Sequence, residues 1–169
     1  MYALAINGSP RKGGNTEHLL KRVIAPLDKA GWDTEMVRVG AMGIRGCIAC
    51  YECFKNKDAS CAVKDDPLNK YLEKIYRADA LIFGSPTHFA SVSGDLKGLM
   101  DRAGLVALAN GGLLRGKIGA AVAAVRRGGG VNVFDTINHV FQMSEMITPG
   151  STYWNIGYGL HHGEVESDE

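Results

Sequence analysis

The segment Leu4–Leu20 reads L-A-I-N-G-S-P-R-K-G-G-N-T-E-H-L-L. A short apolar run ends at Asn7, a loop rich in glycine and small polar residues follows, and apolar residues recur at helical spacing from Leu19 onward. This order predicts a buried strand, a tight loop and the N-terminus of a helix. Such a loop makes an anion site, because the first N–H groups of a helix lack intrahelical partners and the helix dipole adds partial positive charge.

The loop itself predicts a phosphate site. It matches neither G-x-G-x-x-G nor G-x-x-x-x-G-K-[ST], which excludes the dinucleotide fingerprint and the nucleoside-triphosphate loop. Glycines would let the backbone approach a ligand, and hydroxyl, amide and basic side chains would bind it. An ordinary polar loop with two solvated cations is the alternative. The candidate phosphate ligands are Ser9, Arg11, Lys12, Gly14, Asn15 and Thr16.

Length and composition favour a single domain spanning residues 1–169. The net charge is +1 and no basic stripe runs along a predicted helix, so nucleic acid is not an expected partner. No apolar run is long enough to span a membrane, and no signal-peptide pattern precedes the first strand, which favours a cytoplasmic protein. Thiols stay reduced there, so the four cysteines indicate metal ligands or redox groups rather than structural disulfides.

Strand-like and helix-like segments alternate along the whole chain. This order predicts an α/β fold with right-handed crossovers, a doubly wound five-stranded parallel sheet of order 2-1-3-4-5. Pro26 should kink or shorten the first helix. After the first strand, the expected elements are helix 16–30, strand 33–39, a helix starting at Asp66-Pro67, strand 79–83, helix 93–102, strand 117–125, helix 132–146 and strand 151–157.

Three glycine-bearing loops, 8–15, 84–93 and 126–131, follow strands and should meet at the carboxyl edge of the sheet, where ligands bind in such folds. The first loop fits the pattern G-S-x-R-x-x-x-N-[ST], and the second reads G-S-P-T-H-F, followed by S-G, L-K and D-R at Ser93, Leu96 and Asp101. These motifs resemble the phosphate and ring-binding loops of flavodoxin-like NAD(P)H:FMN reductases.

The resemblance implies FMN as cofactor, with its phosphate on the first loop and its ring against the other two. The chemistry would then occur on FMN, and no side chain need act as a nucleophile. His88 stands where the family usually has Tyr; its imidazole would stack on the flavin or hold charge near it, unless it is a surface residue. Asp101 and Arg102 are interpreted as a structural ion pair. The implied ring ligands are Ser85, Pro86, Thr87, His88 and Phe89, with Arg126, Arg127 and Gly128 on the other side.

A cysteine-bearing insert, Gly40–Lys64, separates the second strand from the next helix. Cys47, Cys50, Cys53 and Cys61 follow the spacing C-x2-C-x2-C-x7-C, which favours a [4Fe–4S] cluster bound by residues 43–64. Zinc is a weaker alternative, because zinc ribbons use two C-x2-C knuckles about 15–20 residues apart. Reduced thiols without metal are the other alternative.

Together with the flavin loops, this insert resembles that of the iron–sulfur flavoproteins, a branch of the same reductases. The resemblance implies an electron-transfer flavoprotein with FMN and a cluster, exchanging electrons with a small molecule or small protein, with NAD(P)H as a transient donor. The alternatives are an NAD(P)H-dependent FMN, quinone or nitro-compound reductase without a cluster, and a flavin/thiol redox sensor. The apolar stretch Ala103–Leu114 is interpreted as a surface loop at a homodimer or homotetramer interface.

Overall fold

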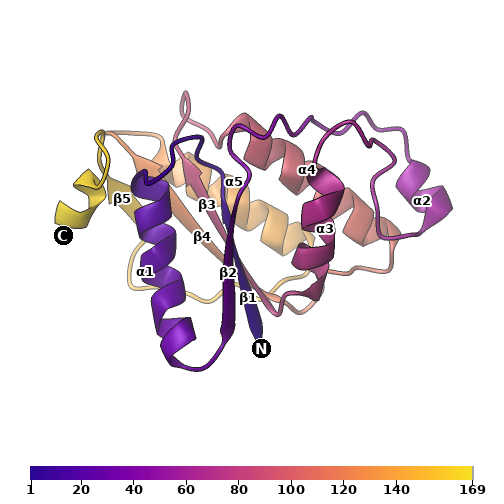
Figure 1. The fold of residues 1–169 in the computed structure, drawn as a ribbon, viewed down its shortest axis with the longest axis horizontal. Coiled ribbons are helices and arrows are strands. Elements are labelled where there is room, and N and C mark those ends of the chain that lie inside the picture. The colour runs from indigo at the N-terminus through magenta and orange to yellow at the C-terminus, as the bar shows by residue number, and fades with distance from the viewer. Residues whose placement is uncertain (169) are drawn as a thin grey trace.

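A computed structural model describes residues 1–168, and Figure 1 shows a central sheet between helices. All strand pairs are parallel, in the order β2-β1-β3-β4-β5. This confirms the predicted flavodoxin-like, doubly wound fold. The strands are β1 (Tyr2–Asn7), β2 (Asp33–Arg38), β3 (Ala80–Pro86), β4 (Ile118–Val125) and β5 (Ile156–Tyr158).

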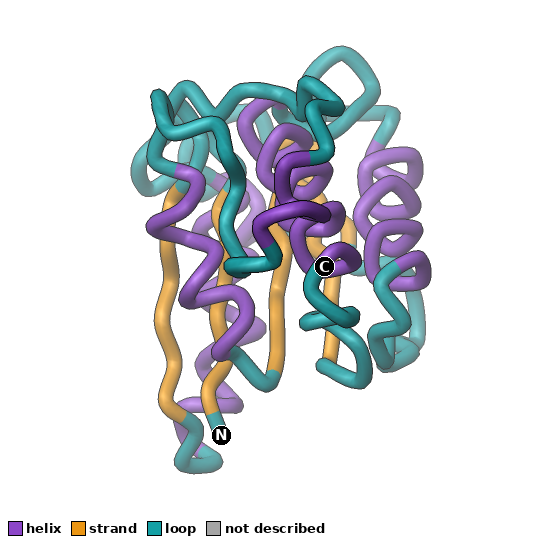
Figure 2. The backbone as a smooth tube through the Cα atoms, turned by 90° about the vertical axis from the view of Figure 1, so that its right-hand side faces the viewer, coloured by secondary structure: helices purple, strands orange, loops and turns teal. Residues whose placement is uncertain are grey.

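Successive strand residues point to opposite faces of the sheet, so each face packs against its own set of helices. The two faces are covered unequally. Leu20 of α1 packs on a cluster with Ala3 and Ala5, whereas Leu4 and Ile6 belong to the larger core beneath α3, α4 and α5. Figure 2 shows connecting loops at both ends of the strands. The helices are α1 (Asn15–Lys29), α2 (Glu52–Asn56), α3 (Leu68–Arg77), α4 (Gly94–Ala109), α5 (Gly130–Met143) and the 3₁₀ helix η1 (Glu164–Ser167).

Two predictions about helices were wrong. Helix α1 continues through Pro26, which lies on the exposed side, where water can bond the carbonyl group that a proline leaves without a donor. Helix α4 continues to Ala109, so most of Ala103–Leu114 is not a loop. Its residues Val106 and Ala107 are buried, and Gly104 has open space around it. Within residues 1–168, no helix has the length and apolar character needed to cross a membrane.

The remaining differences lie in short elements. The predicted strand 151–157 contributes only Ile156–Tyr158 to the sheet, and residues 151–155 lie outside it. Helix α2 inside the cysteine insert and η1 near the chain's end were not predicted. Both are shorter than two helical turns, so neither carries a periodic apolar pattern that a sequence could reveal.

Candidate functional site

The loop after β1 is folded by its own hydrogen bonds. Asn7 Oδ1 accepts from Ser9 N at 2.9 Å, and Glu17 accepts from Gly13 N at 2.9 Å. Gly14 is the N-cap of α1, and no side chain of the described residues caps it. The first N–H groups of α1 therefore remain open to a ligand, as an anion site requires.

The turn after β2 supports this loop from behind. A Cβ added to Gly40 would lie 2.2 Å from the carbonyl carbon of Ser9 and 2.5 Å from Pro10 N. Val39 N donates to Asn7 O at 2.8 Å, which extends the β1–β2 pairing to the loop. Only glycine fits at position 40, since any side chain would displace the phosphate loop.

The predicted loops converge on a cleft of about 250 Å³ at the carboxyl ends of the strands. Eight predicted residues line it: Ser9, Arg11, Asn15, Thr16, Pro86, Thr87, His88 and Arg126. The sequence interpretation missed four others: Pro10, Ala124, Gly159 and Leu160. The remaining predicted ligands are not among the lining residues: Lys12, Gly14, Ser85, Phe89, Arg127 and Gly128.

The segment after β5 closes one side of the cleft. Arg11 Nη1 donates to Leu160 O at 3.0 Å, and His18 Nδ1 lies 2.8 Å from Glu166 Oε1. A Cβ on Gly159 would lie 2.6 Å from Asn15 Nδ2, so this segment passes against α1. Gly159, directly after β5, was the one feature of the sequence that could have indicated the contact of this segment with α1. Arg11 has five N–H donors, so its bond to Leu160 leaves others for a ligand.

The loop after β3 forms a small hairpin at the cleft. His88 and Ser91 exchange backbone hydrogen bonds of 2.9 and 3.1 Å, and Phe89 and Ala90 between them have φ of 49° and 67°. Phe89 is fully exposed at the tip. Ser85 is buried below the hairpin, and its Oγ accepts from Ser93 N at 3.0 Å. Ser85 thus shapes the loop, and Phe89 points away from the cleft wall.

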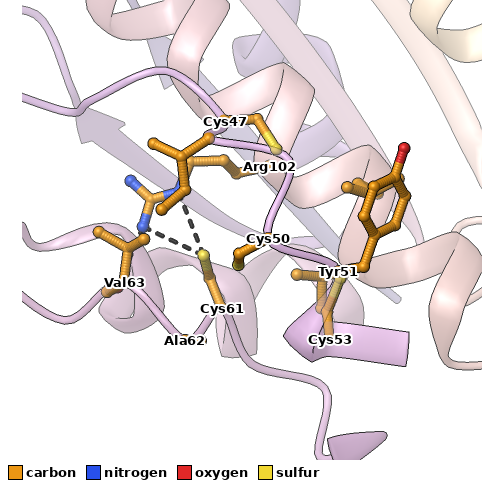
Figure 3. Close-up of a pocket in the computed structure, with 11 residues that line it drawn as sticks. Cys47, Cys50, Tyr51, Cys53, Cys61, Ala62, Val63 and Arg102 are labelled. Carbon is orange, nitrogen blue, oxygen red and sulfur yellow. Dashed lines mark hydrogen bonds between the residues drawn. The ribbon is translucent and has the colours of Figure 1, made fainter. Parts of the chain in front are cut away.

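The four cysteines lie around a second, shallow hollow with a volume of only about 20 Å³, which Figure 3 shows with Tyr51, Val63 and Arg102 at its edge. Cys47 and Cys50 are exposed, Cys61 is half-buried and Cys53 is buried. Within residues 1–168, no three or more Cys, His, Asp or Glu side chains are gathered around one metal position. Burial raises the pKa of the Cys53 thiol, and the neighbouring Cys61 and Cys50 act in the same direction.

The backbone of the insert is unusual. Ala49, Tyr51, Lys57 and Ala59 have φ of 53°, 57°, 50° and 56°, in the left-handed region that favours glycine. Each such non-glycine residue costs roughly 1–2 kcal/mol. Tyr51 and Lys57 bracket α2, so the short helix begins and ends at strained residues. The contacts of the insert must offset this cost.

The expected ion pair between Asp101 and Arg102 does not form. Lys97 pairs with Asp101 one turn away on the exposed face of α4, and the buried Arg102 pairs with Asp66. Adjacent helical residues point in different directions, which is why a D-R dipeptide does not pair with itself. Arg102 also donates to Cys61 Sγ from Nε and Nη2, each at 3.3 Å (Figure 3).

Comparison with known proteins identifies the family of this chain. A family model described as NADPH-dependent FMN reductase matches residues 1–161. The chain belongs to this family. Within the NADPH-dependent FMN reductases, it groups with the iron–sulfur flavoproteins. One from Methanocaldococcus jannaschii is 34% identical over all of this chain and 89% of the relative. One from Archaeoglobus fulgidus is 34% identical over 92% of this chain and 75% of the relative.

Solved structures show the same fold. The Trp repressor binding protein from Bacillus subtilis superposes with a TM-score of 0.71 at 20% identity, over 98% of this chain and 90% of that chain. A flavodoxin from the domain Archaea gives a TM-score of 0.61 at 16% identity, over 99% and 90%. At these identities the likeness concerns the fold alone. The family makes this reductase an FMN-dependent oxidoreductase.

The cleft fits FMN. Thr87 is one of the residues that line the cleft, and its Oγ1 is buried without a hydrogen-bond partner among residues 1–168. A buried hydroxyl without a partner costs about 1–3 kcal/mol, and a polar ligand in the cleft would remove this cost. The open N-terminus of α1 and the side chains of Arg11 and Thr16 suit a phosphate at the other end.

The cysteine hollow fits an iron–sulfur cluster in its donor set. Four thiols from one insert surround it, which is the ligand number that [4Fe–4S] clusters use. Ala49 N lies 3.4 Å from Cys47 Sγ, and two N–H groups of Arg102 point at Cys61 Sγ. Such N–H groups stabilise thiolate sulfur.

Proposed function

We propose that this reductase transfers electrons between FMN in the cleft and a [4Fe–4S] cluster held by Cys47, Cys50, Cys53 and Cys61. The observation that carries the proposal is that all four cysteines of the C-x2-C-x2-C-x7-C motif line one hollow. When bound, FMN exchanges two electrons and a cluster exchanges one, so the pair would connect two-electron donors with one-electron acceptors. The iron–sulfur flavoprotein relatives support this proposal.

At the flavin cleft, this chain's residues would bind and orient the cofactor. Ser9, Asn15 and Thr16 would donate to the phosphate together with the N–H groups of α1, and Arg11 would add positive charge. Pro86, Thr87 and His88 would lie along the ring, with Arg126 on the other side. The sequence has no G-x-G-x-x-G motif that would bind NAD(P)H separately. A nicotinamide donor would therefore stack directly on the flavin.

At the hollow, the cysteines divide into two pairs. Cys53 and Cys61 are anchored toward the protein interior, whereas Cys47 and Cys50 are exposed. The exposed pair would bring one side of the cluster close to solvent, where a partner can approach. The side chains of Ile48 and Tyr51 are exposed beside them and form an apolar rim.

A second candidate is an NAD(P)H-dependent FMN, quinone or nitro-compound reductase whose cysteines bind no cluster. The observation that favours it is that the described sulfur atoms are not gathered around one metal position. Under the first proposal, cluster assembly would require rotation of the cysteine side chains. Cys47 and Cys50 can rotate because they are exposed.

Anaerobic purification followed by iron, acid-labile sulfide and flavin analysis tests the proposal. We expect one FMN and four iron atoms per chain. Cys50→Ser should lose the iron and sulfide and keep FMN, because a hydroxyl is a poor ligand for iron and Cys50 does not line the cleft. Ala62→Ser, which adds the same hydroxyl to the rim of the hollow, is the matched control and should keep the cluster.

Two results would contradict the cluster. Stoichiometric zinc without sulfide in the wild type would make the insert a structural zinc site. Equal electron transfer to a one-electron acceptor by wild type and Cys50→Ser would remove the cysteines from the electron path and favour the second candidate. Oxidation of NAD(P)H with added acceptors separates either enzyme from a redox sensor without turnover.

We also propose that the protein is a homodimer or homotetramer. The apolar loop predicted at 103–114 is largely helix, but α4 and α5 border an apolar groove of about 460 Å³, with Leu108 and Met143 exposed along it. Exposed apolar surface of this kind is typical of interfaces. Light scattering at micromolar concentration is expected to give a mass of two or four chains.

A further inference from the structure

Arg102 is the largest side chain in the protein that is fully buried, with 1% of its area exposed. A guanidinium group has five N–H donors, and here five bonds are made. Nε and Nη2 donate to Cys61 Sγ at 3.3 Å, Nη2 also to Val63 O at 3.1 Å, and Nη1 to Arg45 O at 3.2 Å and to the carboxylate of Asp66. The group has one orientation that satisfies every donor.

Every one of these partners belongs to the insert or its two ends. Arg45 lies two residues before the first cysteine, whereas Cys61, Val63 and Asp66 lie at the return of the insert to α3. Arg102 itself lies on α4, outside the insert. One side chain from the rigid core of the fold thus joins the entry and the exit of the cysteine-bearing segment.

Asp66 makes the buried charge of Arg102 tolerable. Its side chain is 3% exposed and accepts from Arg45 N at 3.0 Å and Leu68 N at 3.1 Å in addition to Arg102. Burial alone would raise the pKa of Asp66, but these hydrogen bonds outweigh it and lower the pKa below its ordinary value. The pair is therefore ionised, and the guanidinium keeps its charge beside Cys61.

The two hydrogen bonds to Cys61 differ from the other three. Carbonyl and carboxylate oxygens are strong acceptors, whereas a neutral thiol is a weak one. Two N–H groups of a cation aimed at a single sulfur suit a thiolate that binds iron. A purely structural arginine would need only the oxygen acceptors.

Two neighbours on α4 hold the same segment. Asp95 accepts from Ala41 N at 2.8 Å and from Ile44 N at 2.7 Å, and a Cβ on Gly98 would lie 2.8 Å from Arg45 O. Positions 95, 98 and 102 lie three and four residues apart, so they form one stripe along the helix. Asp95 and Gly98 contact the entry of the insert, and Arg102 alone of the three contacts the Cys61 sulfur. The backbone of Cys61 is held separately by Asn69 of α3, whose Oδ1 accepts from Cys61 N at 2.8 Å.

We propose that Arg102 is a positioning residue that fixes the Cys61 sulfur for the cluster and raises the cluster's reduction potential. The inference rests on the proposed cluster. Hydrogen bonds to ligand sulfur and nearby positive charge stabilise the reduced cluster, which carries one more electron. A role confined to folding would leave the potential unchanged as long as the cluster is bound.

Midpoint potentials from anaerobic titrations followed by EPR test this. Arg102→Lys keeps a charge opposite Asp66 but loses the planar pair of N–H donors. We expect its reduced cluster to be disfavoured at least tenfold, a shift of about 59 mV to more negative potential. Asp66→Asn keeps the shape and removes a negative charge, so its potential should rise. Lys97→Met, on the exposed face of α4, should change nothing.

Opposite shifts for Arg102→Lys and Asp66→Asn support the inference, and unchanged potentials in both overturn the tuning. Hydrogen exchange on the cluster-free protein provides the second test. Arg102→Lys should speed exchange across residues 61–66 at least tenfold, and Lys97→Met should not; equal exchange rates overturn the positioning. If the wild type contains neither iron nor sulfide, the proposed cluster fails, while the exchange measurement still decides the role of Arg102.

Discussion

The flavin cleft lies at the carboxyl ends of β1, β3, β4 and β5, whereas the cysteine hollow lies on a segment between β2 and α3 that adds no strand to the sheet. In the cleft, backbone pairing places the loops: Gly8 N donates to Gly84 O at 2.8 Å and Thr87 N to Ala124 O at 2.8 Å. In the insert, side chains of α4 hold a backbone with five left-handed non-glycine residues, which are the four named above and Ala41.

This difference indicates how far each site is preformed in the absence of its cofactor. The sheet fixes the cleft, since its register would have to change for the loops to separate. The insert has few buried apolar residues, among them Ile44 and Cys53, and relies on polar contacts. We therefore expect the cleft to keep its shape without FMN and the hollow to tighten only when its cofactor binds.

Gly40→Ala should have the largest effect on the flavin side. The added Cβ would overlap the backbone of Ser9, so the phosphate loop must move. We expect FMN affinity to fall about 100-fold, equivalent to roughly 2.7 kcal/mol. Fluorescence titration measures it, and Gly46→Ala, with open space around its Cβ in the described structure, is the control. Unchanged FMN affinity in folded Gly40→Ala would show that the loop is not rigid.

Gly98→Ala tests the cysteine side in the same way. Its Cβ would press on the carbonyl groups of Ile44 and Arg45, so the insert should shift and lose more than half of its iron while FMN stays bound. Gly104→Ala on the same helix meets open space and should instead stabilise α4 by about 1 kcal/mol. Equal iron content in both variants would mean that α4 does not position the insert.

Arg11→Ala combined with Thr16→Ala should weaken FMN binding at least tenfold. Each side chain lines the cleft at the open end of α1, and a charge-assisted contact contributes about 1.5–3 kcal/mol. Lys12→Ala is the matched control, because Lys12 lies outside the cleft. The phosphate assignment fails if the double variant binds FMN as tightly as the wild type in a fluorescence titration.

Ala59→Gly should have the smallest effect, and its sign is the informative part. Ala59 has φ of 56°, so glycine should stabilise the cluster-free protein, by about 1 kcal/mol. Ala25→Gly in the exposed interior of α1 should destabilise it by about the same amount. Urea midpoints measure both. Destabilisation by Ala59→Gly would mean that the left-handed residues of the insert are not strained.

The sequence predicted the sheet correctly, and it placed the residues of both candidate sites on segments that the fold brings together, because these signals are local. Apolar runs followed by glycine-rich loops mark β1, β3 and β4, and the four closely spaced cysteines line one hollow. The proposed phosphate ligands Ser9, Arg11, Asn15 and Thr16 line one cleft with the loop after β3, because parallel strands bring their carboxyl ends to one edge.

What the sequence did not predict depends on contacts between distant residues. The uniformly apolar stretch after Arg102 hid the helical period of α4, and its glycine suggested a loop. Leu160 reaches Arg11 across 149 positions, and Arg102 reaches Cys61 and Asp66 across 41 and 36. A dipeptide such as Asp101-Arg102 carries no information about which partner each side chain finds in three dimensions.

The stripe on α4 also bears on protein engineering. A designer who wished to give a cluster-free flavodoxin-like scaffold an iron–sulfur centre would transplant the loop with its four cysteines. The loop's anchors are elsewhere, at Asp95, Gly98 and Arg102. Those three positions would have to be grafted together with the loop, since without them the recipient helix offers the transplanted segment no bonding partner and no room.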